Sequence, residues 1–117
     1  MFKISKKPTF TWPVNAAVVG DKGQYTKVSF TAEFKRVTQA EIDELLERLR
    51  AEAEENKLTD RALADELLVG FTDVADEDGQ PLEYSQTNKE MLLNVPGIAS
   101  IVAQTFFKAI GGAREKN

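Results

Sequence analysis

Apolar and polar residues alternate along two stretches in the first third of the chain. A period of two places every second side chain on the same face of a β-strand. The residues expected on the inward face are Phe10, Trp12, Val14, Ala16 and Val18, followed by Val28, Phe30, Ala32 and Phe34. Between the two stretches, residues 20–23 read Gly-Asp-Lys-Gly, and their two glycines can adopt positive φ angles. The pattern predicts an antiparallel β-hairpin.

The edges of this hairpin need protection or cover. Pro13 cannot donate a ladder hydrogen bond, so we expect it at an open edge or a bulge. Lys27 and Lys35 are expected on the solvent face, where lysine discourages pairing with another strand. A short third strand could form at Phe2-Lys3-Ile4. Because an isolated hairpin is only marginally stable in water, helices must cover its apolar face.

After residue 37 the apolar residues follow the period of a helix. Thr38 and Glu41 have the spacing of a capping box, which predicts a helix beginning there. Thr59-Asp60 begins a second helix, which is expected to extend to about Phe71 with Gly70 weakening its last turn. The expected inward residues are Ile42, Leu45, Leu46 and Leu49 in the first helix, and Leu63, Leu67 and Leu68 in the second.

Two further helices are predicted near the end of the chain. Ser85 is expected to cap the third, which ends at Val95-Pro96 because a residue before proline avoids the α region. The fourth follows Pro96 and ends at Gly111-Gly112. Its apolar stripe consists of Ile98, Ile101, Val102, Thr105, Phe106 and Ile110.

Together these elements predict an α+β fold in which an N-terminal antiparallel β-hairpin packs on about four α-helices. We expect a single domain over residues 1–110, with a hairpin part at 1–37 and a helical part at 38–110. Residues 111–117 are expected to form a flexible charged tail.

Composition removes most kinds of chemistry. The 117 residues include no cysteine and no histidine, which excludes disulfides and the Ser-His-Asp and Cys-His catalytic arrangements. We expect no cofactor, no metal and no enzymatic activity. The one enzyme class left open is a carboxylate-based, metal-assisted hydrolase using Asp73, Asp76 and Asp78. No apolar run has the length of a membrane span, and no signal peptide is evident, so we expect a soluble intracellular protein.

The net charge of −4 is unevenly distributed. Residues 1–36 hold seven basic and two acidic side chains, whereas the remainder hold eight basic and seventeen acidic ones. Such asymmetry can favour head-to-tail association, although surface charge mostly serves solubility. The negative net charge argues against a nucleic-acid partner, because domains that bind nucleic acid are usually basic overall.

An acidic turn at Asp76–Gly79 invites comparison with a calcium-binding loop. If Gly79 took position 6 of an EF-hand, Val74 and Ser85 would fall at positions 1 and 12, which require oxygen ligands and a bidentate carboxylate. The spacing leaves at most a weak, adventitious cation site. The segment instead predicts a tight turn with Gly79 at positive φ.

Adjacent phenylalanines on the fourth helix suggest a second kind of site. One helical stripe cannot bury both Phe106 and Phe107. Phe107 is therefore a candidate for an exposed apolar contact with a partner or with a second copy of the chain.

The order of motifs over residues 71–107 resembles the tail assembly chaperones of long-tailed bacteriophages and prophages. That family carries an aromatic residue, an acidic segment with an Asp-Gly turn, a proline, a Tyr-Ser helix start, an apolar helix and a P-x-[VI]-A-x-x-[IV] helix. The corresponding positions here are Phe71, Asp73-Val74, Asp76–Gly79, Pro81, Tyr84-Ser85, Met91-Leu92-Leu93 and 96–101. Weaker similarity extends the match to roughly residues 24–110.

This resemblance implies a non-enzymatic protein of the host cytoplasm. It would bind the tape measure protein and keep it soluble until the tail tube protein polymerises around it, so both are expected partners. The candidate protein-binding residues are Phe71, Tyr84, Leu93, Phe107 and Ile110. The alternative is a structural protein of the particle, such as a minor tail or head–tail connector protein.

Overall fold

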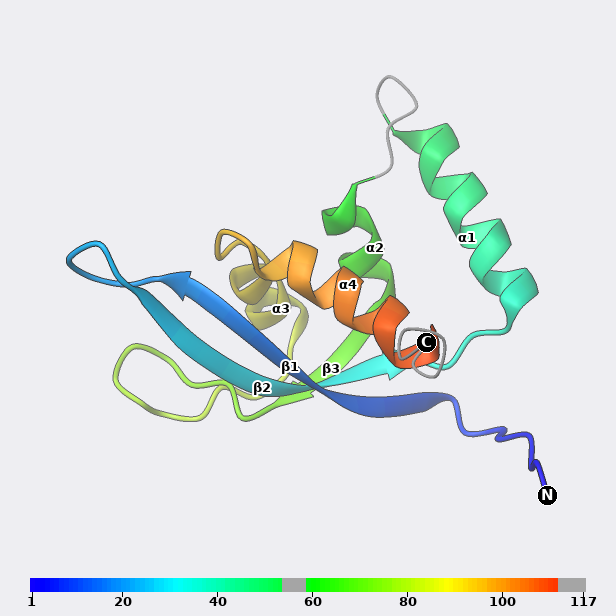
Figure 1. Ribbon diagram of the computed structural model, residues 1–117, viewed down its shortest axis with the longest axis horizontal. Helices are drawn as coiled ribbons and strands as arrows, with labels where there is room; N and C mark the ends of the chain where they lie inside the picture. The colour runs from blue at the N-terminus through cyan, green and yellow to red at the C-terminus, as the bar shows by residue number, and fades with distance from the viewer. Residues whose placement is uncertain (54–58, 112–117) are drawn as a thin grey trace.

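The protein folds as one three-stranded sheet with helices on one face. The computed structural model describes residues 1–53 and 59–111, and the statements below concern these residues. The elements are β1 (Thr9–Val19), β2 (Tyr25–Lys35), α1 (Gln39–Glu52), α2 (Asp60–Leu67), β3 (Leu68–Thr72), α3 (Gln86–Leu93) and α4 (Ile98–Gly111). The sheet is antiparallel in the order β1-β2-β3, and α2, α3 and α4 lie over the same face (Figure 1). The predicted α+β class is confirmed. Of the predicted tail, residues 112–117 lie outside the described residues.

The hairpin forms in the predicted place. Val14 pairs with Phe30 and Phe10 with Phe34, so the expected inward sets share one face. The turn is closed by the N–H of Gly20 donating to the carbonyl of Gln24 at 2.9 Å. Trp12 departs from expectation: it pairs with the buried Ala32 but is itself 43% exposed. It lies on the inner face of β1, the outermost strand. On the side away from β2, the described residues place no further strand beside it.

Strand β3 replaces the predicted end of the second helix. The helix ends at Leu67, and Leu68–Thr72 then pairs with β2, with Phe71 opposite Ala32. The valine, phenylalanine and threonine of this segment favour a strand. Gly70 lies so close to Glu33 that an added Cβ would collide with its carboxylate. The prediction that Phe71 ends a helix was wrong, and residues 38–110 are not purely helical.

The suggested strand at residues 2–4 does not form. Met1 to Lys7 run as an exposed segment outside the sheet, ending in the arm at the lower right of Figure 1. The third strand of the sheet comes instead from the middle of the chain. A strand at residues 2–4 would need a partner edge, and the described residues supply none beside it.

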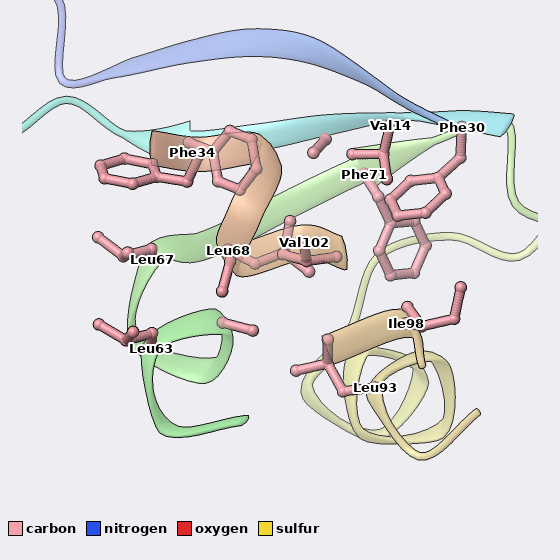
Figure 2. Packing of buried hydrophobic residues seen from close by; sticks show 14 of the residues in the cluster. Val14, Phe30, Phe34, Leu63, Leu67, Leu68, Phe71, Leu93, Ile98 and Val102 are labelled. Atoms are coloured by element: carbon pink, nitrogen blue, oxygen red, sulfur yellow. The ribbon is translucent and has the colours of Figure 1, made fainter. Parts of the chain in front are cut away.

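The core lies between the sheet and the three covering helices. Phe30 and Phe71 project from the sheet toward Ile98 and Leu93, at the junction of α3 and α4 (Figure 2). Towards the other end of the sheet, the ring of Phe106 on α4 packs edge-on against Phe34, with centroids 5.4 Å apart. The largest fully buried side chains are Phe34, Phe106, Leu67, Leu68, Val14 and Val102.

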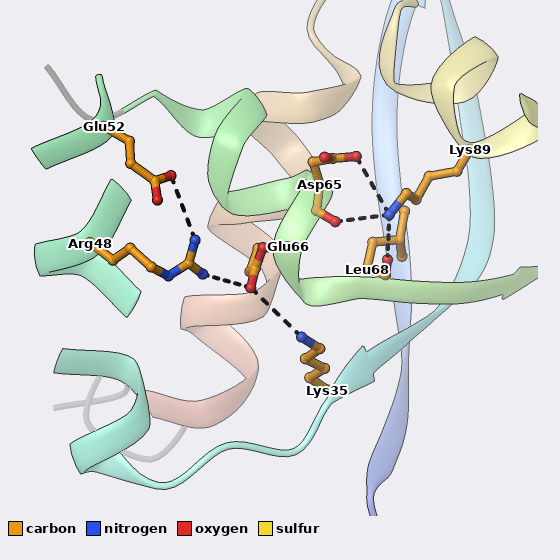
Figure 3. Close-up of polar contacts among 7 residues, drawn as sticks. All are labelled: Lys35, Arg48, Glu52, Asp65, Glu66, Leu68 and Lys89. Atoms are coloured by element: carbon orange, nitrogen blue, oxygen red, sulfur yellow. Dashed lines mark hydrogen bonds and ion pairs between the residues drawn. The ribbon is translucent and has the colours of Figure 1, made fainter. Parts of the chain in front are cut away.

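Helix α1 attaches to this body by a short apolar stripe and one exposed ion pair, Arg48–Glu66. Ile42 and Leu45 are buried, and Leu46 and Leu49 are half-buried, as the periodicity predicted. Two ion pairs converge on the Glu66 carboxylate of α2, from Arg48 at 2.7 Å and Lys35 at 3.8 Å (Figure 3). Because these groups are solvent-exposed, each pair contributes only about 0.2–1 kcal/mol.

The helix caps predicted at Thr38 and Ser85 are present, and Thr59, predicted to begin the second helix, caps it. The Thr38 hydroxyl accepts from the Glu41 N–H at 3.1 Å, while the Thr38 N–H donates to the Glu41 carboxylate at 2.9 Å. Thr59 accepts from the N–H of Ala62 at 3.1 Å, and Ser85 from that of Asn88 at 3.0 Å. Each side-chain oxygen satisfies a backbone donor that has no partner inside the helix.

The capping box gives a testable pH dependence. Hydrogen bonds from the Thr38 backbone and side chain hold the pKa of Glu41 below the ordinary glutamate value. A lowered folded-state pKa contributes stability that is complete above the unfolded pKa and is lost as pH falls through the folded value. An NMR titration of the Glu41 carboxyl should show the lowered midpoint. Thr38→Ala keeps the backbone N–H, which is the larger cause, and removes the side-chain hydrogen bond, so it should raise the midpoint only part of the way toward the ordinary value. Thr59→Ala, which removes a different cap, should leave it unchanged; an unaltered midpoint in Thr38→Ala would contradict this account.

Candidate protein-binding surface

The acidic turn before α3 is closed by its own first aspartate. One carboxylate oxygen of Asp76 accepts from the N–H groups of Asp78 and Gln80, both at 2.9 Å. Gly79 has a φ of 82° and donates to the Asp76 carbonyl at 3.0 Å, which confirms the predicted glycine conformation. Over residues 1–53 and 59–111, no group of three potential metal-binding side chains occurs. By accepting hydrogen bonds from two backbone N–H groups, the Asp76 carboxylate stabilises the turn.

A second turn sets the angle between α3 and α4. Helix α3 ends at Leu93, two residues before the predicted end, and Gly97 has a φ of 87°. The two helices are bent by 100° at this break. The Arg61 guanidinium of α2 donates to the side-chain oxygen of Asn94 at 2.7 Å, which fastens the turn to the body. Within the described part of the chain, no single helix is long and apolar enough to cross a membrane. Only the bent pair of α3 and α4, taken together, reaches that length and apolarity.

The five candidate residues differ in their exposure. Phe71 and Leu93 are 6% and 3% exposed and belong to the core, so they offer no surface to a partner in this conformation. Tyr84 is 37% exposed and covers Phe71, with ring centroids 5.3 Å apart. Ile110 is 46% exposed, while Phe107 is half-buried beside Phe106.

These residues do not form one patch. Phe71 and Leu93 lie near Ile98, where α4 begins, and Tyr84 is with them through its contact to Phe71 (Figure 2). Phe107 and Ile110 occupy the other end of α4. A helix rises about 1.5 Å per residue, so Phe107 and Ile110 lie roughly 14–18 Å along α4 from Ile98.

A buried lysine fixes the junction between α2 and β3. Lys89 on α3 is buried, and its ammonium group donates to the carbonyls of Asp65 at 2.8 Å and Leu68 at 3.2 Å (Figure 3). The Asp65 carboxylate lies 3.5 Å away. The last carbonyls of a helix lack partners within it, and a cation there satisfies them. Lys89 therefore stabilises the point at which the helix becomes a strand.

The whole chain, residues 1–117, matches a family model described as phage tail assembly chaperone. The chain belongs to the phage tail assembly chaperone family. Separate searches of curated proteins and of solved structures found no match. Membership confirms the resemblance seen in residues 71–107. It gives this tail assembly chaperone a role with tail proteins during assembly and suggests a non-enzymatic one.

The tail assembly chaperone also exposes apolar residues that the sequence reasoning did not select. Met91 and Val95 are exposed on the outer side of α3 and at its end, four residues apart. Three consecutive apolar residues, Met91 to Leu93, cannot all face the core of a helical protein, because neighbours point in different directions. That run was the available signal that one member faces outward, and in the structure this member is Met91.

Proposed function

We propose that this tail assembly chaperone binds the tape measure protein and keeps it soluble in the host cytoplasm while the tail forms. The family membership supports a role with tail proteins, and five apolar side chains on or beside α3 and α4, four of them exposed and Phe107 half-buried, support direct binding. We call these side chains the apolar contact set: Tyr84, Met91, Val95, Phe107 and Ile110. The tail tube protein is a second proposed partner.

The chemistry of the contact set suits an apolar helix. Helix α4 has a single charged residue, Lys108, among its 14 positions. A partner helix that presents apolar side chains at every third or fourth position can bury them against such a surface. Each fully buried large apolar side chain contributes about 1.5–3 kcal/mol. The two groups at opposite ends of α4 would contact the partner over a span of roughly 14–18 Å.

Co-expression with the tape measure gene from the same genome tests the proposal. The wild-type chain should keep the tape measure protein in the soluble fraction, and Met91→Asp should move most of it to the pellet by placing a charge in the apolar contact. Gln104→Asp adds the same charge at an exposed polar position of α4 and should behave as wild type. Thermal unfolding of both variants shows that each is folded.

The outcomes separate three cases. A tape measure protein that stays insoluble with the wild-type chain rejects the proposed function. Solubility that survives Met91→Asp, and the same change at Ile110, rejects the contact set while keeping the function. Recovery of the chain in purified tails would favour the alternative, a structural component of the particle.

A further inference from the structure

Strand β1 leaves one edge of the sheet open. Hydrogen-bonded and non-hydrogen-bonded pairs alternate along an antiparallel ladder. The ladder is hydrogen-bonded just beyond both ends of β1, at Pro8–Arg36 and Gly20–Gln24, each at 2.9 Å. Even-numbered residues therefore direct their backbone groups to β2. The odd-numbered residues, which direct theirs to the open edge, are Thr9, Thr11, Pro13, Asn15, Ala17 and Val19. Pro13 thus faces the open edge, as predicted.

This edge lacks the usual protection against pairing. Natural edge strands carry charged side chains that repel a further strand. Residues 9–19 contain no charged side chain. Lys27 and Lys35, expected to protect the edge, lie on β2, which is the central strand, so that prediction was wrong. Pro13 removes one donor from the edge, but its carbonyl still accepts.

The segment that leads into β1 is positively charged. Residues 1–19 contain three lysines and no acidic residue, although the whole chain has a net charge of −4. The three lysines, Lys3, Lys6 and Lys7, are all exposed on residues 1–8, which we call the basic arm. A hollow of about 480 Å³ lies between the basic arm and residues 36–38, and the described residues that line it include Arg36 but no acidic one. Carboxylates are therefore the groups that complement this end of the edge.

Exposed apolar side chains accompany the lysines. Trp12 is 43% exposed on the inner face of β1, and Phe2 and Ile4 are 89% and 82% exposed on the basic arm. Side chains on neighbouring strands stabilise a sheet when apolar groups lie opposite one another. An added strand that alternates apolar and polar residues would place its apolar side chains beside Trp12.

We propose that an acidic, extended segment of another protein adds to β1 as a fourth strand, with its carboxylates beside the basic arm. In this mode of binding, main-chain hydrogen bonds supply affinity and side chains select the partner. Neighbouring strands lie about 4.7–4.9 Å apart, so the lysine side chains of the basic arm reach the carboxylates of a segment that continues past Thr9. This surface is separate from the apolar contact set on α3 and α4, and the pairing does not depend on binding to the tape measure protein.

Other occupants match only part of this surface. A second copy that pairs through its own β1 brings the same three lysines and no carboxylate from residues 1–19. A nucleic acid would neutralise the lysines with its phosphates, but it offers no row of alternating N–H and C=O groups for β1. An acidic strand satisfies both the open ladder and the lysines.

Two labelled peptides and the full chain test the pairing. Each peptide alternates valine and threonine and carries a run of aspartates, at its N-terminal end in one peptide and at its C-terminal end in the other, so that both strand directions are covered. Fluorescence anisotropy should show binding of at least one of them, and added salt should weaken it. A matched peptide with lysines in place of the aspartates should bind at least about tenfold more weakly.

Amide hydrogen exchange locates the bound peptide. The outward N–H groups of Thr9, Thr11 and Asn15 should exchange about tenfold more slowly when the peptide is bound. The amides of Phe10 and Val14 are directed to β2 and should change little. Simple attraction of the peptide to the basic arm would leave all five amides unchanged.

Two sets of variants separate the contributions of backbone and charge. Thr11→Pro removes an outward N–H, a change that Pro13 shows the strand tolerates, and should weaken binding about tenfold. Thr11→Val keeps the N–H and should bind as wild type. Changing all three lysines of the basic arm to glutamine should also weaken binding about tenfold and remove most of the salt dependence. The basic arm lies outside the sheet, so this last variant decides the matter if Thr11→Pro fails to fold.

Four results would overturn the proposal. The first is that neither acidic peptide binds, and the second is that binding leaves the outward amides unprotected or is equal in Thr11→Pro and Thr11→Val. Protection of the same amides that rises with protein concentration, without any peptide, would assign the edge to a second copy. A single-stranded oligonucleotide that binds the basic arm more tightly than the acidic peptides would assign the arm to nucleic acid. All four leave the solubility test of the tape measure protein unaffected.

Discussion

Replacing Phe106 with alanine should lower the free energy of unfolding by about 3–5 kcal/mol. Phe106 is fully buried, and its ring lies 5.4 Å from that of Phe34 and 6.1 Å from that of Phe10, measured between centroids. It therefore joins α4 to both strands of the hairpin. Truncation leaves a cavity that the sheet cannot fill, because the strands on one side are held by their ladder. Domains of this size are stable by about 5–15 kcal/mol, so the variant would approach unfolding.

Urea denaturation followed by circular dichroism gives this difference directly. Tyr25→Ala is the matched control, since Tyr25 is an aromatic residue of the same sheet that lies exposed near the hairpin turn. Its free energy of unfolding should change by no more than about 0.5 kcal/mol. A loss below about 1 kcal/mol in Phe106→Ala would mean that α4 does not pack on the hairpin as described.

Replacing Lys89 with methionine should lower the free energy of unfolding by about 2–4 kcal/mol. Methionine keeps most of the length and apolar surface of the side chain but donates no hydrogen bond. The carbonyls of Asp65 and Leu68 would then lose their donor in a buried place. Substituting a buried charge with an apolar group is often harmless when its partner is also removed, but backbone carbonyls stay.

The control for this variant is Lys108→Met, an exposed lysine on α4. It should unfold within about 0.5 kcal/mol of wild type. Hydrogen exchange adds a local measurement: amides of β3 should exchange faster in Lys89→Met. Unchanged stability together with unchanged exchange in β3 would show that Lys89 does not hold the junction.

The parts of the fold that were predicted depend on neighbours in sequence. The helix caps at Thr38, Thr59 and Ser85 need only a hydroxyl and an N–H two or three residues away. The β1–β2 hairpin needs two alternating runs and a turn. Each of these can be read from the chain because the partner atoms lie within the same short segment.

Strand β3 was missed because its information is not local. Leu63, Leu67 and Phe71 are spaced four residues apart, which is also the spacing of a helix face. The strand forms because β2 offers a free ladder on that side and Gly70 permits close approach to Glu33. Nothing in residues 68–72 alone reports the position of β2.

The candidate surface was harder to predict for a related reason. Periodicity identifies apolar faces but not what covers them. Phe71 and Leu93 lie in the core, whereas Met91, two residues before Leu93 in the same helix, is exposed. Lys89 gave no signal of its burial, because a lysine near the start of a helix is ordinarily solvated.

The contact between β1 and α4 has a consequence for biosynthesis. β1 and α4 are the first and last of the described elements, and Phe10 and Phe106 meet across them. The hairpin leaves the ribosome early, yet its apolar face stays bare until residues 98–111 have been translated. Folding is therefore completed only once nearly the whole domain has been synthesised, and the nascent chain exposes a strand edge and an apolar face until then.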